Sequence, residues 1–145
     1  MRRLLLLSCS ERKHSGGGYL PARERYDGVS FRVLKKLERE HAFPKDLDVL
    51  ILSAKYGLIP AETLIGYYDQ KMTRERATVL APSVSEKLDS VLRQKKYSEI
   101  FINLGKHYLV ALQLSHELPK HYVRYAAGGI GSRMKQMKQW ILNYG

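Results

Sequence analysis

The residues with the most reactive groups follow directly on an apolar run near the start of the chain. Leu4 to Leu7 lead into a loop that contains the only cysteine, Cys9, together with Lys13, His14 and glycines at 16–18. A thiol can act as a nucleophile, while a lysine and the backbone amides of glycines can bind an anion. The segment therefore predicts a substrate-binding loop at the end of a strand that is buried on both faces.

Cys9 has two interpretations. As a nucleophile, its thiolate would be favoured by the charge of Lys13, and His14 is the one base identified nearby. As a structural residue, it would be a small buried side chain at a strand end. The other histidines show no metal-ligand spacing, so no zinc site is expected, and no carboxylate pair resembles a glycosidase dyad. Glu62 and Asp69 are the acids considered as a general base.

A second polar loop follows a second apolar run, over residues 48–53. Ser53 offers a hydroxyl at the strand end, and Tyr56 offers a ring that could stack on a base. The alternative is that Tyr56 packs into the core, and the same alternative applies to Tyr26, Tyr67 and Tyr68.

Glycines near the end of the chain suggest an anion site. Gly128, Gly129 and Gly131 lie between an expected strand and an expected helix, where backbone N–H groups can cradle a phosphate, and Arg133 would add charge. The spacing matches neither a Walker motif nor a dinucleotide fingerprint, and a tight turn is the alternative. The glycines at 16–18 could form a second cradle, a hinge or a merely flexible loop.

Alternating apolar runs and helical periodicity indicate how these loops are positioned. Strands are expected over 4–7, 48–53, 99–104 and 121–125, and residues 19–28 and 53–71 are expected to be irregular. Helices are expected over 29–41, 73–81, 82–95 and 107–118, followed by a last helix with Met134, Met137, Ile141 and Tyr144 on one face. This order predicts an α/β fold, a single Rossmann-like three-layer sandwich over residues 1–145 with a mainly parallel sheet of about four strands. Polar loops beginning at Ser8, Ser53, Gly105 and Tyr125 would then converge at its carboxyl edge.

Composition restricts the function classes. The chain has 145 residues with a formal net charge of +11, which favours a polyanionic partner or a phosphorylated ligand over a solvated basic surface without a role. One cysteine excludes an intramolecular disulfide and fits the cytoplasm. The apolar run before Cys9 is too short for a signal peptide, and no stretch approaches a transmembrane helix, so no membrane partner is expected.

Two sequence blocks resemble a known group of proteins. Ser8-Cys9-Ser10-Glu11-Arg12-Lys13 contains an S-C-x-x-K pattern, followed by Pro21-Ala22-Arg23 with Tyr26, and residues 51–58 read I-L-S-A-K-Y-G-L. Together with Gly129-Ile130-Gly131 before a basic helix, they resemble an uncharacterised bacterial and phage family related to the peroxide-stress protein YaaA and distantly to archaeosine synthase. The resemblance implies a Rossmann-like domain in which the two blocks form one pocket. It also implies either DNA binding linked to oxidative stress or chemistry on a modified base.

The leading hypothesis is an enzyme that acts on a nucleotide, nucleoside or nucleic-acid base, by group transfer or glycosidic-bond cleavage. Its candidate catalytic residues are Cys9, Ser10, Lys13 and Ser53. Its candidate substrate- or phosphate-binding residues are Ser8, Arg12, Arg23, Tyr26, Ala54, Tyr56, Gly57, Tyr68, Gly105, Gly128, Gly129, Gly131 and Arg133. The alternatives are a non-catalytic protein that binds DNA or RNA and a module that senses a small nucleotide. No cofactor, metal or oligomeric state follows from the sequence.

Overall fold

The computed structural model describes residues 2–143, so Tyr144, predicted on the face of the last helix, lies outside them. The main sheet has five strands in the order β4–β3–β1–β6–β7. Central β1 (Arg2–Ser8) is parallel to β3 (Leu47–Ser53) and β6 (Tyr97–Asn103), and β7 (Val123–Tyr125) is parallel to β6. β4 (Gly57–Pro60) is antiparallel to β3 and adds a fifth strand to the four expected.

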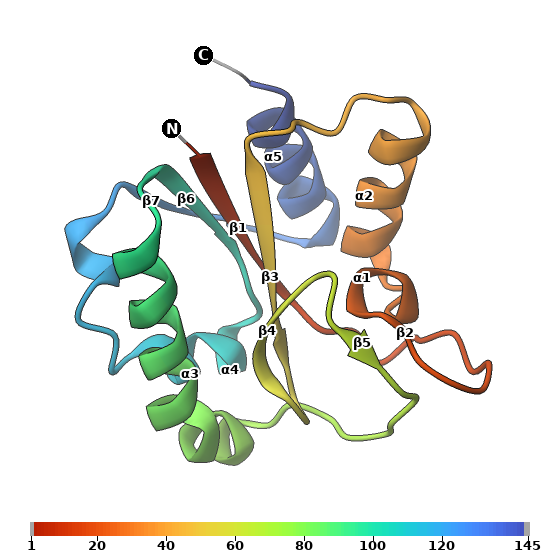
Figure 1. Cartoon of the computed structure of the whole chain (residues 1–145), viewed down its shortest axis with the longest axis horizontal. Helices are drawn as coiled ribbons and strands as arrows, with labels where there is room; N and C mark the ends of the chain where they lie inside the picture. The colour runs from red at the N-terminus through yellow and green to blue at the C-terminus, as the bar shows by residue number, and fades with distance from the viewer. Residues whose placement is uncertain (1, 144–145) are drawn as a thin grey trace.

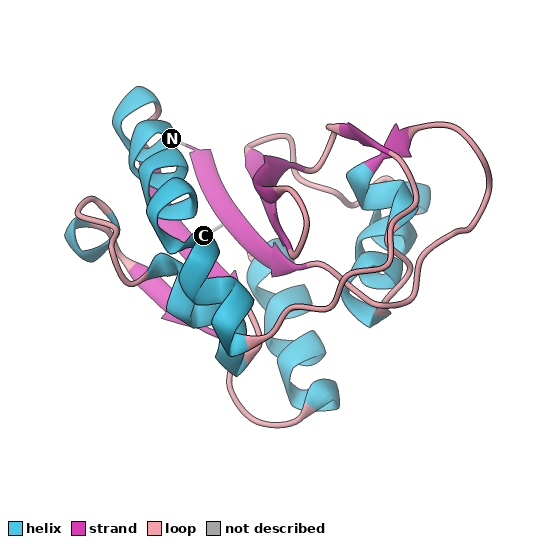
Figure 2. Cartoon of the chain, turned by 90° about the horizontal axis from the view of Figure 1, so that it is seen from below, coloured by secondary structure: helices cyan, strands magenta, loops and turns pink. Residues whose placement is uncertain are grey.

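The four leucines of β1 explain the arrangement around the sheet. Leu4 to Leu7 are each 0% exposed, because successive strand residues point to opposite faces and both faces are covered. Leu5 and Leu7 pack with α2 (Val29–Arg39) and α5 (Ile130–Leu142), whereas Leu4 and Leu6 pack with α3 (Arg74–Gln94). Figures 1 and 2 show these helices on the two sides of the sheet.

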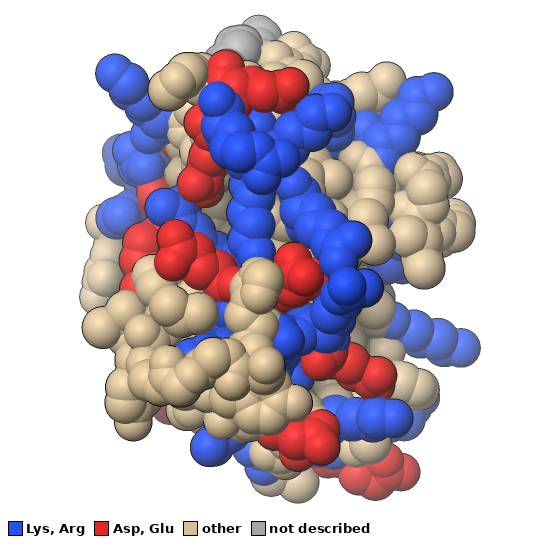
Figure 3. Space-filling view, turned by 90° about the vertical axis from the view of Figure 1, so that its right-hand side faces the viewer, with Lys and Arg blue, Asp and Glu red and all other residues tan. Residues whose placement is uncertain are grey.

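Helix α2 carries a strongly basic outward side. The buried side of the helix, which faces the sheet, consists of Phe31, Leu34 and Leu37. The opposite side carries the basic residues Arg32, Lys35, Lys36 and Arg39. Figure 3 shows lysine and arginine side chains gathered on this side of the molecule, with acidic residues among them.

Two segments expected to be irregular contain short elements. β2 (Leu20–Pro21) pairs antiparallel with β5 (Leu64–Ile65), and α1 (Ala22–Arg25) follows β2. The predicted long loop over residues 53–71 also contains β4, because Gly57, at a φ of 76°, reverses the chain and lets it pair with the free side of β3.

Two helix boundaries differ from the prediction. α3 is one helix through Pro82 rather than two, since the exposed ring leaves the buried face of the helix intact. The helix expected over 107–118 is broken into α4 (Lys106–Leu109) and 3₁₀ turns at Val110–Leu112 and Leu118–Lys120. Here the Asp89 carboxylate accepts bonds from the Ser115 hydroxyl and from two backbone N–H groups, which competes with helical bonding. Among residues 2–143, no helix is long and apolar enough to cross a membrane.

Candidate functional site

A cavity of about 340 Å³ opens at the carboxyl edge of the two central strands. Ser8, Cys9 and Ser10 line it from the end of β1, and Asn103 and Gly105 line it from the end of β6. The chain leaves β1 toward β3 on one side and leaves β6 toward β7 on the other, so the strand order reverses between them. Ligands of open α/β sheets bind outside the strand ends at such a point.

The opposite wall of this cavity, called the switch-point groove here, is formed by the amino ends of α2 and α5. These helices begin after Gly28 and Gly129, with no side-chain cap and no acidic residue in the first turn. Their first N–H groups lack intrahelical partners, which makes such ends electropositive. Arg133 also lines the groove, where its guanidinium donates to the carbonyl oxygens of Gly128 and Leu104 at 3.1 and 3.2 Å.

Cys9 places the one thiol at the wall of the groove. Its side chain is 8% exposed, and its Sγ lies 3.3 Å from the hydroxyl of Tyr108. Burial raises the pKa of Tyr108, and the charge of a Cys9 thiolate raises it further. The phenol therefore stays protonated at neutral pH, so it can donate a hydrogen bond to the sulfur.

A buried cluster of three hydroxyls lies behind the second polar loop. The Tyr26 hydroxyl donates to Ser53 Oγ at 3.1 Å, and the Tyr68 hydroxyl lies 3.0 Å from Ser53 Oγ and 2.5 Å from that of Tyr26. Ser53 Oγ also accepts from the backbone N–H groups of Lys55 and Tyr56. Burial raises the pKa of Tyr26 to about 12 and also raises that of Tyr68.

Two lysines lie over the aromatic rings of this cluster. Lys13 Nζ is 4.6 Å from the centre of the Tyr68 ring, and Lys55 Nζ is 5.2 Å from that of Tyr56. Tyr56 stands edge-on to Tyr68 and is 40% exposed. Some of the predicted site residues therefore belong to this cluster and others line the switch-point groove, and Tyr56 is outside the groove lining.

Other predicted site residues have structural partners. Tyr26 is fully buried, so its ring cannot stack on a ligand, and the Ala54 carbonyl accepts from Arg76. Arg12 Nε lies 3.5 Å from Asp27 Oδ2. The Arg23 guanidinium donates to the Glu38 carboxylate, away from the groove. Gly57 and Gly128 adopt positive φ in turns, while Gly129 and Gly131 begin α5 beside open space.

The glycines at 16–18 are held by a buried arginine. Arg25 is 0% exposed and donates to the carbonyl oxygens of His14, Gly16 and Gly18. This interaction turns those carbonyls toward the guanidinium and anchors the segment to α1.

Several groove residues were not anticipated from the sequence. They are Asn103, Met134 and the exposed helix-starting residues Val29 and Ile130, and Tyr108, which contacts Cys9 from outside the lining, was not anticipated either. A polar residue at the end of the apolar run 100–102 was the one signal that could have identified Asn103. Val29 comes close to Ile130 and Met134 only through the packing of α2 against α5.

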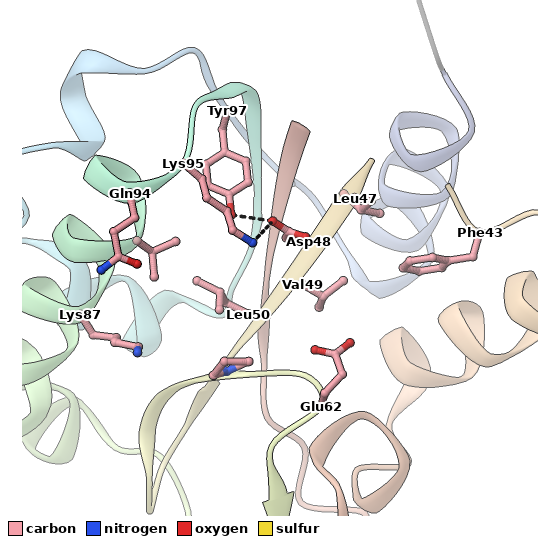
Figure 4. Close-up of a pocket in the computed structure, with 12 residues that line it drawn as sticks. Phe43, Leu47, Asp48, Val49, Leu50, Glu62, Lys87, Gln94, Lys95 and Tyr97 are labelled. Atoms are coloured by element: carbon pink, nitrogen blue, oxygen red, sulfur yellow. Dashed lines mark hydrogen bonds and ion pairs between the residues drawn. The ribbon is translucent and has the colours of Figure 1, made fainter. Parts of the chain in front are cut away.

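A second cavity, of about 300 Å³, lies at the opposite edge of the sheet (Figure 4). Asp48 is its polar centre and accepts bonds from Arg2, Lys95 and Tyr97. Burial raises the pKa of Asp48, but these hydrogen bonds and the neighbouring positive charges outweigh it and lower the value to about 2. Because this carboxylate is already paired, its environment is that of a structural ion cluster.

Comparisons with known proteins give a family and a fold. The chain gave no match among curated proteins. It is similar to the solved structure "Crystal structure of AF0587, a protein of unknown function", with a TM-score of 0.58 and 15% identity over 99% of this chain. The chain spans 45% of the length of that protein. A family model described as "Family of unknown function (DUF6884)" matches residues 4–139, so the chain belongs to this family.

Proposed function

We propose that the protein is an enzyme that binds a nucleotide, nucleoside or nucleobase in the switch-point groove and acts on it by group transfer or glycosidic-bond cleavage. The observation that supports this most is the position of the groove. It combines a thiol, two uncapped helix amino ends and an arginine where the strand order reverses. In this proposal the chain forms one Rossmann-like three-layer domain.

Each part of the groove has a chemical role in the proposal. The amino ends of α2 and α5 with Arg133 bind the anionic part of the ligand, since unpaired N–H groups and a guanidinium both favour negative charge. Cys9 lies nearest the reacting atom in this proposal, and the Tyr108 hydroxyl lies within hydrogen-bond distance of its sulfur. The hydroxyls of Ser8 and Ser10 are bonded to Gly105 N–H and to the Arg12 carbonyl and hold the loop in place.

The loop cluster has a supporting role. Lys13 and Tyr56 flank Tyr68, so they can contact a part of the substrate that extends out of the groove. The resemblance to YaaA-like and archaeosine synthase-like proteins stays a prediction, and chemistry on a base would agree with it.

The test is thermal stabilisation with a panel of nucleoside monophosphates, nucleosides and free bases. A ligand at 100 times its Kd stabilises the native state by about 2.7 kcal/mol. We expect stabilisation by at least one phosphorylated member, loss of the shift in Arg133→Ala, and retention in Arg74→Ala, an exposed arginine at the start of α3.

The chemical role of Cys9 is tested with the stabilising ligand. Incubation followed by mass spectrometry should show conversion by the wild-type protein and none by Cys9→Ser, with binding retained. Absence of stabilisation by every panel member would overturn the proposal.

The basic side of α2 favours a second candidate, a nucleic-acid-binding protein (Figure 3). Arg2 and Arg3 do not belong to this basic side. Arg2 pairs with Asp48, and buried Arg3 donates to the carbonyls of Trp140 and Ile141.

Salt dependence tests this second candidate. DNA or RNA binding should weaken steeply as salt rises, because lysine and arginine displace counterions from phosphates. The double change Lys36→Glu and Arg39→Glu on α2 should abolish binding, whereas Lys87→Glu and Arg93→Glu on α3 should not. If the double changes on α2 and on α3 weaken nucleic-acid binding equally, the basic side of α2 is not a specific binding face.

A further inference from the structure

The floor of the switch-point groove contains a buried amide whose hydrogen-bonding capacity is largely unused. Asn103 ends β6, is 5% exposed and lines the groove. Its Nδ2 makes one contact, to Met137 Sδ at 3.5 Å, and a thioether is a weak acceptor. Within residues 2–143, its Oδ1 has no hydrogen-bond partner. Solvent still reaches this atom.

The orientation of this amide follows from its neighbour. Rotating it by half a turn would set Oδ1 against the Met137 sulfur, placing two acceptors together. The observed orientation instead leaves one acceptor and one N–H of Nδ2 without a protein partner. Because Oδ1 is still reached by solvent, a polar group of a ligand that enters the groove can take the place of water on it.

The walls above Asn103 are apolar. Val29 and Ile130, the first residues of α2 and α5, are 51% and 70% exposed and line the groove with Met134. Their exposure at these positions suits contact with the faces of a flat, apolar ring.

We propose that Asn103 is the specificity-determining residue of the groove and reads the edge of a nucleobase that presents a donor beside an acceptor. This inference rests on the proposed function. Oδ1 accepts from the ring edge and Nδ2 donates to it, as amides do in base recognition. Val29 and Ile130 cover the faces of the ring, while the helix amino ends and Arg133 bind the phosphate.

The experiment compares three probes by calorimetry: the nucleoside monophosphate that stabilises the protein best, purine riboside monophosphate, which lacks exocyclic groups, and ribose 5-phosphate. Asn103→Leu should weaken the first probe about tenfold to a hundredfold relative to ribose 5-phosphate. It should weaken purine riboside monophosphate less than the first probe, because purine keeps a ring-nitrogen acceptor for Nδ2 but has no exocyclic donor for Oδ1. Gln94→Leu, which removes an amide at the other edge of the sheet, should change no ratio.

A second variant keeps the test valid if leucine disturbs the fold. Asn103→Asp keeps the shape of the side chain but removes its N–H donor. Its charge affects all three phosphorylated probes alike, so the affinity for the first probe relative to that for ribose 5-phosphate should still fall. Equal loss for all three probes, or no loss, would overturn the role of Asn103 while leaving the proposed function in place. Failure of every probe to bind the wild-type protein would instead overturn the proposed function itself.

Discussion

Two polar residues at opposite ends of the strands show how hydrogen bonding separates a structural role from ligand binding. The Asp48 carboxylate accepts from Arg2, Lys95 and Tyr97, so its bonding capacity is used within the chain. Asn103 is more deeply buried and has one weak contact. We therefore expect substitution of Asp48 to affect folding and substitution of Asn103 to affect recognition.

Asp48→Asn should lower the free energy of unfolding by about 1–2 kcal/mol at pH 7. The folded pKa of Asp48 lies below its unfolded value, so its contribution is present above pH 4 and is lost as the pH falls toward about 2. Urea unfolding at pH 7 and at pH 2.5 measures this. A difference between wild type and variant that persists undiminished at low pH would contradict the assignment.

Gly28→Ala should destabilise the protein by about 1–3 kcal/mol, the usual cost of overpacking. An added Cβ would lie 2.7 Å from Ser10 Cβ, so the loop after β1 would have to move away from α2. Gly131→Ala is the matched control, because its Cβ would meet no atom within 4 Å and alanine favours the helix. Chemical denaturation of both variants should give effects of opposite sign.

At the scale of elements, the hydroxyl cluster joins three separate segments. Tyr26 follows α1, Ser53 ends β3, and Tyr68 belongs to the segment after β5. The cluster thus fixes the two polar loops relative to each other. The sequence blocks around Cys9 and Ser53 are close in space because β1 pairs with β3 as far as the Cys9 N–H, which donates to the Leu52 carbonyl oxygen.

Ser53→Ala should destabilise the fold by about 1–3 kcal/mol, because it leaves buried donors without an acceptor. Hydrogen exchange should accelerate in residues 54–56 and 66–71, since the lost bonds anchor those segments. Ser98→Ala, an exposed strand serine, serves as the control and should leave exchange in both segments unchanged.

Pro82→Ala should raise the stability of α3 by about 1–3 kcal/mol, since proline in a helix interior removes a backbone hydrogen bond. The position is exposed and far from the groove residues, so ligand binding should not change. Thermal unfolding with and without the stabilising ligand measures both effects. A lower melting temperature would show that the proline ring supports a local bend that the helix requires.

For the whole molecule, the apolar runs of the sequence were sufficient to locate the parallel strands and their shared carboxyl edge. Leu4 to Leu7 and the run 49–52 are buried in neighbouring strands as expected. The broken helix after β6 could not be predicted, because its cause is the Asp89 carboxylate, distant in sequence. Of the groove lining, the end of β1 and Arg133 were predicted, whereas Val29 and Ile130 were missed because α2 and α5 come together only in the folded chain.

The central position of β1 has a consequence for synthesis of the protein. Leu5 pairs with Val49 on one side and with Phe101 on the other. Because β3 and β6 both follow β1 in the chain, the edges of β1 are covered only after both of these strands have been synthesised. Non-local pairing of this kind slows folding and exposes apolar surface to other chains. The nascent leucine strand is therefore the segment where we expect chaperone dependence to originate.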